Sequence, residues 1–231
     1  TREIALEEGM KVKVATLKSG QPKDRVKAAL GGGRLHALPA APDICEAIVD
    51  DCTNIVALAG IEQVAAALAT GADIVIAGRT TDTAIIAALP VVRGDHAGAA
   101  WHGAKVGECG ALATTQPNSG VIQIDFDATG FTIEPMAADA AATPYTVSAH
   151  MLYENSDPFI LHEPGGHLDV TRSDYEALDG RRVRVEGSKW VPGRYTVKLE
   201  GARVVGYQTV GLAVVRERRY VQHVREWAAD M

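Results

Sequence analysis

Residues 143–157 carry side chains whose types and spacing could do acid–base chemistry. Thr143 and Pro144 are typical of the first two positions of a helix, which we expect to end near Asn155. On such a helix His150 and Glu154 are four residues apart, so the imidazole and the carboxylate come within reach of each other. A carboxylate on one ring nitrogen raises the basicity of the other, as general-base chemistry requires. The spacing therefore predicts a base with its orienting group, and the alternative is an ordinary exposed ion pair.

Two further segments carry reactive side-chain types. Residues 162–169, His-Glu-Pro-Gly-Gly-His-Leu-Asp, gather imidazoles and carboxylates, which are ligands of transition metals. Their spacing matches no metal motif, so we interpret this segment as a loop with incidental polar residues and predict no metal site. Cys109 lies in Gly-Glu-Cys-Gly, residues 107–110, which is typical of a tight turn that carries a thiol. A buried, inert cysteine is the alternative to a reactive one.

Residues 71–84 predict a ligand-binding loop between a buried strand and a helix. A continuous apolar run ends at Gly78, which lets the backbone turn, and Asp82 can cap a helix that begins near Thr83. The free amides of that helix and the Arg79 guanidinium would face a bound anion. The alternative is that Arg79 and Asp82 only pair with each other and cap the helix.

The first half of the chain alternates helices and strands. Such alternation indicates a parallel sheet with helices over it, which is an α/β arrangement. A capping box of Asp43 and Glu46 predicts the start of one helix, and Pro90 predicts the end of another. The expected elements are a strand at 12–17, a helix from 43, a helix at 61–68 ended by Gly71, a strand at 73–77 and a helix at 83–89.

The second half is richer in strands. Turn-forming residues at 116–120 predict a boundary, with an α/β part at 1–117 and a β-rich α+β part at 118–231. Alternation at 122–126 and again at 131–133 predicts a hairpin, in which Asp125 and Asp127 share a solvated face. Further strands are expected at 183–185, 195–199 and 204–215, followed by a helix from Tyr220.

Composition and charge exclude several classes of protein. The chain is 47% hydrophobic with a net charge of −6 and without long charged blocks, so we expect a globular protein that binds neither nucleic acid nor membranes. The three cysteines form no Cys-x-x-Cys pair, which argues against a disulfide framework and a zinc site and suits the cytoplasm. A homo-oligomer is the default expectation. Because the chain lacks an initiator Met and soon enters a strand, we expect that the protein continues upstream.

Three segments together carry a resemblance to a known family. Gly-Ala-Asp-Ile-Val-Ile-Ala-Gly-Arg-Thr-Thr-Asp at 71–82, Glu-Cys-Gly at 108–110 and Thr-Val-Ser-Ala-His-Met-Leu-Tyr-Glu-Asn-Ser-Asp-Pro at 146–158 resemble the acyclic terpene utilisation family, AtuA-like, in order and spacing. Relatives usually carry an upstream Gly-x-Gly-x-Gly-Phe segment, which this chain lacks. Many also have a Gly-Gly-rich continuation after Glu-Cys-Gly, where this chain reads Ala-Leu-Ala-Thr-Thr-Gln. That departure puts a shared substrate in doubt.

The resemblance implies catabolism of terpenoid or branched acyl compounds, without a settled reaction. The expected activity is that of a hydratase or lyase on an acyl-CoA or a related acid, and the cofactor is unknown. In this scheme His150 is the base and Glu154 orients it, with Glu108 or Cys109 nearby. Gly78, Arg79, Thr80 and Asp82 would hold the anionic group of the ligand. The alternative is a non-catalytic subunit or binding module that docks its β-rich tail on another protein.

Overall fold

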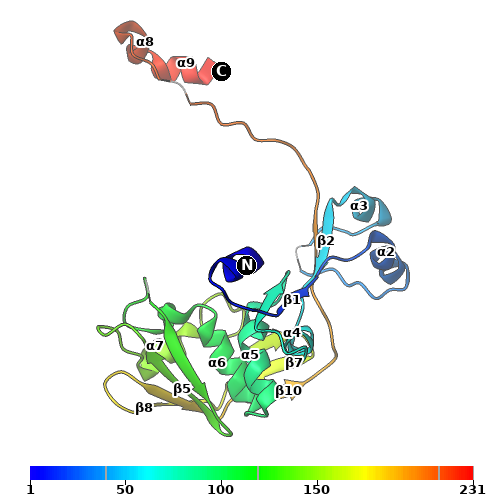
Figure 1. The fold of residues 1–231 in the computed structure, drawn as a ribbon. Helices are drawn as coiled ribbons and strands as arrows, with labels where there is room; N and C mark the ends of the chain where they lie inside the picture. Colours follow the sequence, from blue (N-terminus) through cyan, green and yellow to red (C-terminus); the bar gives the residue numbers. More distant parts are fainter. Residues whose placement is uncertain (40, 119, 213, 231) are drawn as a thin grey trace.

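The structure is a computed structural model that describes residues 1–39, 41–118, 120–212 and 214–230. It confirms an α/β N-terminal part and a β-rich α+β C-terminal part (Figure 1). The helices are α1 (Arg2–Glu7), α2 (Lys23–Gly31), α3 (Glu46–Asp51), α4 (Ile61–Leu68), α5 (Asp82–Arg93), α6 (Ala97–Gly107), the 3₁₀ turn η1 (Gly110–Ala113), α7 (Pro144–His150), α8 (Arg218–Gln222) and α9 (Val224–Asp230). The strands are β1 (Val14–Leu17), β2 (Asn54–Ala57), β3 (Ile74–Ala77), β4 (Ile122–Phe126), β5 (Gly130–Pro135), β6 (Ile160–Glu163), β7 (Gly166–Asp169), β8 (Asp174–Ala177), β9 (Val183–Glu186), β10 (Lys189–Pro192) and β11 (Leu199–Ala202).

The N-terminal part contains the predicted parallel pair. β1 runs parallel to β3, with Val14 opposite Ile74. α4 packs against both strands, and it ends before Gly71, whose φ of +69° suits a glycine after a helix. β2 pairs antiparallel with β11, so a strand from the far end of the chain completes this part.

The C-terminal part contains two antiparallel sheets. The predicted hairpin is confirmed as β4 and β5, which continue into a four-stranded sheet in the order β4-β5-β9-β8. A three-stranded sheet has the order β10-β7-β6. The solvated face of the hairpin is also confirmed, because Asp125 and Asp127 are both exposed. Asp127 pairs there with Arg184 of β9 at 2.7 Å, and this pairing lowers the pKa of the Asp127 carboxyl.

The main hydrophobic core gathers around α6, which is buried along nearly all of its length. Trp101 of α6 stacks on Trp190 of β10 with ring centroids 4.6 Å apart, and Phe131 and Ile133 of β5 close the core from the four-stranded sheet. A helix rich in alanine and glycine suits this central place, because its small side chains let neighbouring elements approach closely. Because α5 packs along α6 and α7 also joins this core, the helix ends that carry polar groups are held close together (Figure 1).

Elements from both sides of the predicted boundary share this core. Ala84 and Ala87 of α5 lie in the same cluster as Val183 and Val185 of β9. A smaller cluster under α2 and α3 also receives Leu199 from β11. The boundary at 117 stays a prediction, and the packing joins the two parts at α6 and at β11.

The close approach of α6 to the turn before β10 predicts a large effect of one added methyl group. A Cβ at Gly98 would overlap the carbonyl group of Ser188, whose backbone cannot move without disturbing β10. Gly98→Ala is expected to lower the free energy of unfolding by about 2 kcal/mol, measured by urea denaturation. Gly31→Ala at the end of α2 is the matched control, since nothing lies within 4 Å of its added Cβ. Equal stability of the two variants would contradict this packing.

Several predicted helix boundaries are wrong. α3 begins at Glu46 after Cys45, and Asp43 lies outside the helix, so the capping box is not formed. α5 continues through Pro90 to Arg93, because Gly94 with φ of +86° ends the helix and the packing on α4 and α6 compensates for the missing proline donor.

Two predictions for strands and loops also differ from the structure. Residues 162–169 are not a loop but the hairpin of β6 and β7, which turns at Gly165. The strands predicted at 195–199 and 204–215 are reduced to β11 at 199–202, since no strand is formed by residues 195–198, 203–212 or 214–217. Ala213 lies outside the described residues. Ser119 of the predicted boundary turn also lies outside the described residues. Among the described residues, no helix combines the length and apolar character that a membrane crossing requires.

Candidate functional site

The backbone groups of the loop between β3 and α5 are largely hydrogen-bonded to other parts of the protein. A side chain at Gly78 would collide with Ser19, whose hydroxyl donates to the Arg79 carbonyl at 2.7 Å. The Thr81 amide donates to the Ala59 carbonyl at 3.0 Å. The helix cap is Thr81 and not Asp82, because the Thr81 hydroxyl accepts from the Ala84 amide at 3.2 Å. The glycine is therefore explained by close packing, and the loop is well fixed.

Arg79 is already paired with a carboxylate. Its Nε lies 2.9 Å from Glu200 of β11, and Lys198 lies 2.8 Å from the same carboxylate. This pairing lowers the pKa of Glu200 to about 2. The Arg79 side chain is 52% exposed, so the pair is accessible to solvent. The alternative pairing of Arg79 with Asp82 is not among the ion pairs of the described residues, since Arg79 pairs with Glu200, and anion binding by Arg79 and Thr80 stays a prediction.

Five polar side chains meet where α5, α6, α7 and β6 come together, and we call them the acid–base cluster: Thr83, Lys105, Glu108, His150 and Glu163. Lys105 and Glu108 form an ion pair at the end of α6. The Thr83 hydroxyl donates to the other Glu108 oxygen at 2.9 Å. Both charged side chains of the pair are less than one-fifth exposed, so their interaction is only partly screened.

The Glu163 carboxyl retains its proton to a higher pH than an exposed glutamate. Burial at the end of β6 raises its pKa, and the nearby Glu108 carboxylate acts in the same direction. The hydroxyls of Thr83 and Thr81 hydrogen-bond it and oppose the shift, as does the charge of Lys105. A carboxyl group with such a shift is suited to donate a proton.

His150 is the imidazole of the acid–base cluster, and its surroundings favour the neutral form of the ring. Burial at the end of α7 lowers its pKa, and the Lys105 ammonium adds to this effect, while the Glu108 carboxylate opposes it. The side chain is only 6% exposed and hydrogen-bonds the backbone of Lys105. A neutral imidazole can accept a proton, so the cluster holds both a proton acceptor and a proton donor.

The predicted pairing of His150 with Glu154 is wrong. α7 ends at His150, and Glu154 has a left-handed backbone with φ of +54°, so the two residues do not share a helix face. Glu154 instead hydrogen-bonds Tyr153 and raises the pKa of that phenol. The carboxylate that acts on His150 is Glu108, from a different helix.

Cys109 borders the cluster at the turn between α6 and η1. The predicted tight turn is confirmed by Gly110, which has φ of +45°. Burial raises the pKa of the Cys109 thiol, and the neighbouring Glu108 carboxylate acts in the same direction. A raised pKa disfavours the thiolate, which is the nucleophilic form, so the geometry gives Cys109 no support as a nucleophile.

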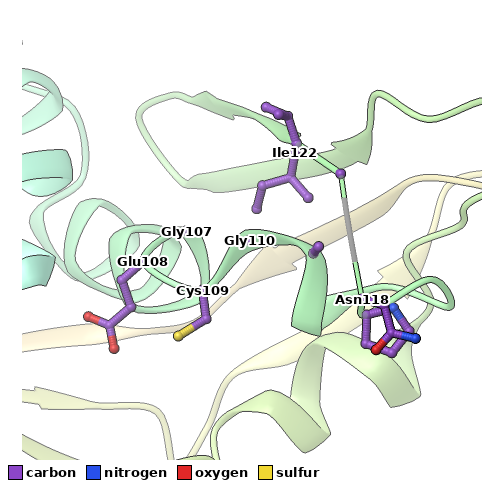
Figure 2. A pocket seen from close by; sticks show the side chains of 10 residues that line it. Gly107, Glu108, Cys109, Gly110, Asn118 and Ile122 are labelled. Carbon is purple, nitrogen blue, oxygen red and sulfur yellow. The ribbon is translucent and has the colours of Figure 1, made fainter.

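An open hollow of about 470 Å³ lies beside the cluster, lined by residues 107–111, 117–118 and 120–122. Figure 2 shows the Glu108 carboxylate and the Cys109 thiol pointing to the same side of the turn, away from Asn118 and Ile122. The carboxylate therefore faces Lys105 and Thr83 and not the hollow. We place the chemistry at the acid–base cluster and assign no role to the hollow.

A second histidine is buried in the core and belongs to a structural network. His102 is fully buried, with Nδ1 at 2.7 Å from the Ser188 hydroxyl and Nε2 at 3.3 Å from the Tyr175 hydroxyl. Burial lowers its pKa to about 3, and the neighbouring His150 contributes in the same direction. Since Ser188 is only 2% exposed, no substrate reaches this histidine, and its partners fix α6 to the sheets.

His162 and His167 face each other across the β6–β7 hairpin with ring centroids 5.7 Å apart. Within the ranges described, no group of three His, Cys, Asp or Glu side chains lies close enough to hold a metal ion.

The sequence analysis did not identify all members of the acid–base cluster. It considered Glu163 only as a possible metal ligand, and it gave no role in the site to Lys105 or Thr83. The three-residue spacing of Lys105 and Glu108 on a helix was the available signal for one of these contacts.

Comparison with known proteins identifies the family. The family model described as acyclic terpene utilisation family protein AtuA matches residues 1–229 of the 231. No match was found among curated proteins or among solved structures. The match spans both parts of the fold and every member of the acid–base cluster. The chain therefore belongs to the acyclic terpene utilisation family, AtuA.

Proposed function

We propose that this chain is an enzyme of acyclic terpene utilisation, a hydratase or lyase that acts on a branched acyl-CoA or a related acid. The observation that supports the proposal is that one half-buried cluster, organised around Lys105 and Glu108, contains both an imidazole with a lowered pKa and a carboxyl group with a raised pKa. Addition and elimination of water both require a proton donor and a proton acceptor. Groups with shifted pKa values are common at sites of this kind.

In the proposed hydration, His150 takes a proton from water while the oxygen bonds to the β-carbon of an unsaturated acyl group. The electron pair of the double bond moves to the α-carbon, which takes the proton from Glu163. The reverse sequence eliminates water. Solvent then returns a proton to Glu163 and removes one from His150. Lys105 and Glu108 hold these two groups in position, and Arg79 and Thr80 are the proposed contacts for the anionic part of the ligand.

The proposal predicts that acyl-CoA compounds stabilise the chain. A ligand at a hundredfold excess over its dissociation constant adds about 2.7 kcal/mol. For a chain of this length that corresponds to a rise in Tm of about 5–10 °C. Thermal unfolding is measured with branched α,β-unsaturated acyl-CoA thioesters, the corresponding free acids, and CoA alone as the control. The same mixtures are analysed by mass spectrometry for gain or loss of one water. The proposal would be contradicted if none of these compounds stabilised the chain and none gave a product.

The second candidate function is a non-catalytic subunit of a catabolic complex. The exposed C-terminal residues 203–212 and 214–230 favour it, because exposed apolar chain commonly marks a docking surface. The strand predicted at 204–215 is not found among the described residues of this tail, which are extended and lead into two short helices. A docking subunit would bind a partner and show no stabilisation by acyl-CoA compounds, so the thermal measurement separates the two functions.

A further inference from the structure

The last part of the chain leaves the body and contacts almost nothing. We call residues 203–212 and 214–230 the C-terminal arm. It runs as extended chain from the end of β11 and carries α8 and α9 far from the other elements (Figure 1). Tyr207 is 97% exposed and Leu212 is 96% exposed. Most other large apolar side chains of the arm are exposed too, and they are Val204, Val205, Val210, Val214, Tyr220, Val221, Val224 and Trp227.

The exposed surface is too large for an isolated compact chain. The chain exposes 15136 Å². A compact monomer of this mass exposes about 10,000 Å². The excess of about 5,000 Å² exceeds the share of one partner in an obligate interface, which is about 1,000–2,500 Å². The exposed arm is part of this excess, and its exposed apolar side chains suit a stable interface.

The body offers a surface of matching chemistry. Ile85, Leu89 and Val92 follow one another along one face of α5 and are 52%, 42% and 55% exposed. Tyr220 and Trp227 form a comparable apolar face on α8 and α9, with ring centroids 4.8 Å apart. Charge is complementary as well. The arm has five arginines and three acidic residues, a formal charge of +2, so the rest of a chain with net charge −6 has −8.

We propose that the C-terminal arm packs against the body of a second copy of this chain, with α8 and α9 on the exposed face of α5. β11 fixes the root of the arm beside β2 and directs it away from its own α5 (Figure 1). A reciprocal exchange about a two-fold axis covers both arms and both α5 faces with one kind of contact. The acidic body of one copy attracts the basic arm of the other.

The test is the subunit count of the full chain, measured by native mass spectrometry and by light scattering over a range of concentrations. We expect a dimer. The double variant Tyr207→Asp/Trp227→Asp is expected to raise the dissociation constant at least tenfold, since it places charges within the apolar contact. Leu89→Asp on the receiving face is expected to do the same. The matched control is Gln208→Asp/Gln222→Asp, which adds the same charge to the arm without removing apolar surface, so the loss of affinity beyond that of this control measures the apolar contact.

Several outcomes overturn the proposal. A monomeric full chain whose arm is protected from hydrogen exchange would show that the arm folds back on its own body. A monomer that binds vesicles of anionic phospholipid through the arm would show a membrane-binding segment. A dimer that persists in the double variant would place the interface elsewhere, and a dimer that persists only in Leu89→Asp would exclude α5 as the receiving face. Circular dichroism of every variant confirms that the body remains folded, since the substituted side chains are exposed.

Discussion

His150→Gln is expected to lower turnover by about 10²–10⁴-fold, which is the usual contribution of a positioned acid or base. Glutamine keeps hydrogen-bonding capacity near the backbone of Lys105 but cannot accept a proton. Glu163→Gln is expected to cause a loss of similar size, because an amide cannot replace the proton that the carboxyl group donates. Initial rates are measured with the acyl-CoA compound that the wild-type chain hydrates or dehydrates.

The control for these variants is His36→Gln, which removes an exposed histidine from the loop after α2 and should leave turnover unchanged. The pH profile separates the two roles. The rate rises with pH as His150 loses its proton and falls as Glu163 loses its own, so His150→Gln should abolish the first limb and Glu163→Gln the second. Wild-type turnover in His150→Gln would remove His150 from the mechanism. Thermal stabilisation by the ligand should survive both substitutions.

Acid is expected to destabilise the fold through His102. Its folded pKa of about 3 lies below the ordinary value of 6.5, so the unfolded chain binds this proton more tightly. Stability from this group is therefore complete above about pH 6.5 and is lost progressively as the pH falls towards 3. Between pH 7 and pH 4 the loss is about 3 kcal/mol. Urea denaturation at a series of pH values measures it.

His102→Asn provides the comparison, because asparagine can still hydrogen-bond the Ser188 hydroxyl but does not titrate. The variant should be less stable at pH 7, yet its further loss between pH 7 and pH 4 should be smaller by about 3 kcal/mol. The carboxylates contribute equally to both chains and cancel in the difference. Equal acid dependence in the two chains, or an NMR titration of the His102 ring near pH 6, would refute a buried neutral imidazole.

The sequence predicts local elements of this fold well where the pattern is short-range. The β4–β5 hairpin follows from alternation around a four-residue turn, and the start of α7 follows from Thr143 and Pro144, because each signal lies within the element. β6 and β7 were missed. Their glycines and polar residues hide the strand pattern, and the other neighbour of β7 is β10, more than twenty residues after the turn at Gly165.

In the candidate site, too, the features encoded locally were predicted and those that depend on tertiary packing were not. His150 was singled out correctly as a residue of interest, but its partner was chosen by extending a helix that stops there. The Met151, Leu152 and Tyr153 amides donate to carbonyls three residues earlier, so the chain tightens into a turn and carries Glu154 away. Glu108 acts on His150 from the end of α6, and Glu163 joins the cluster from β6. Both placements depend on tertiary packing, which no local spacing encodes.

The three tryptophans give the molecule two separate optical reporters. Trp101 and Trp190 stack with planes 13° apart inside the core, so their excited states couple and their near-ultraviolet signal follows the integrity of the body. Trp227 is 46% exposed on α9 and has no tryptophan neighbour of that kind in the described part of the chain. A quencher dissolved in water would therefore dim the emission of Trp227 first. The state of the arm and the state of the core can thus be observed independently in the unlabelled chain.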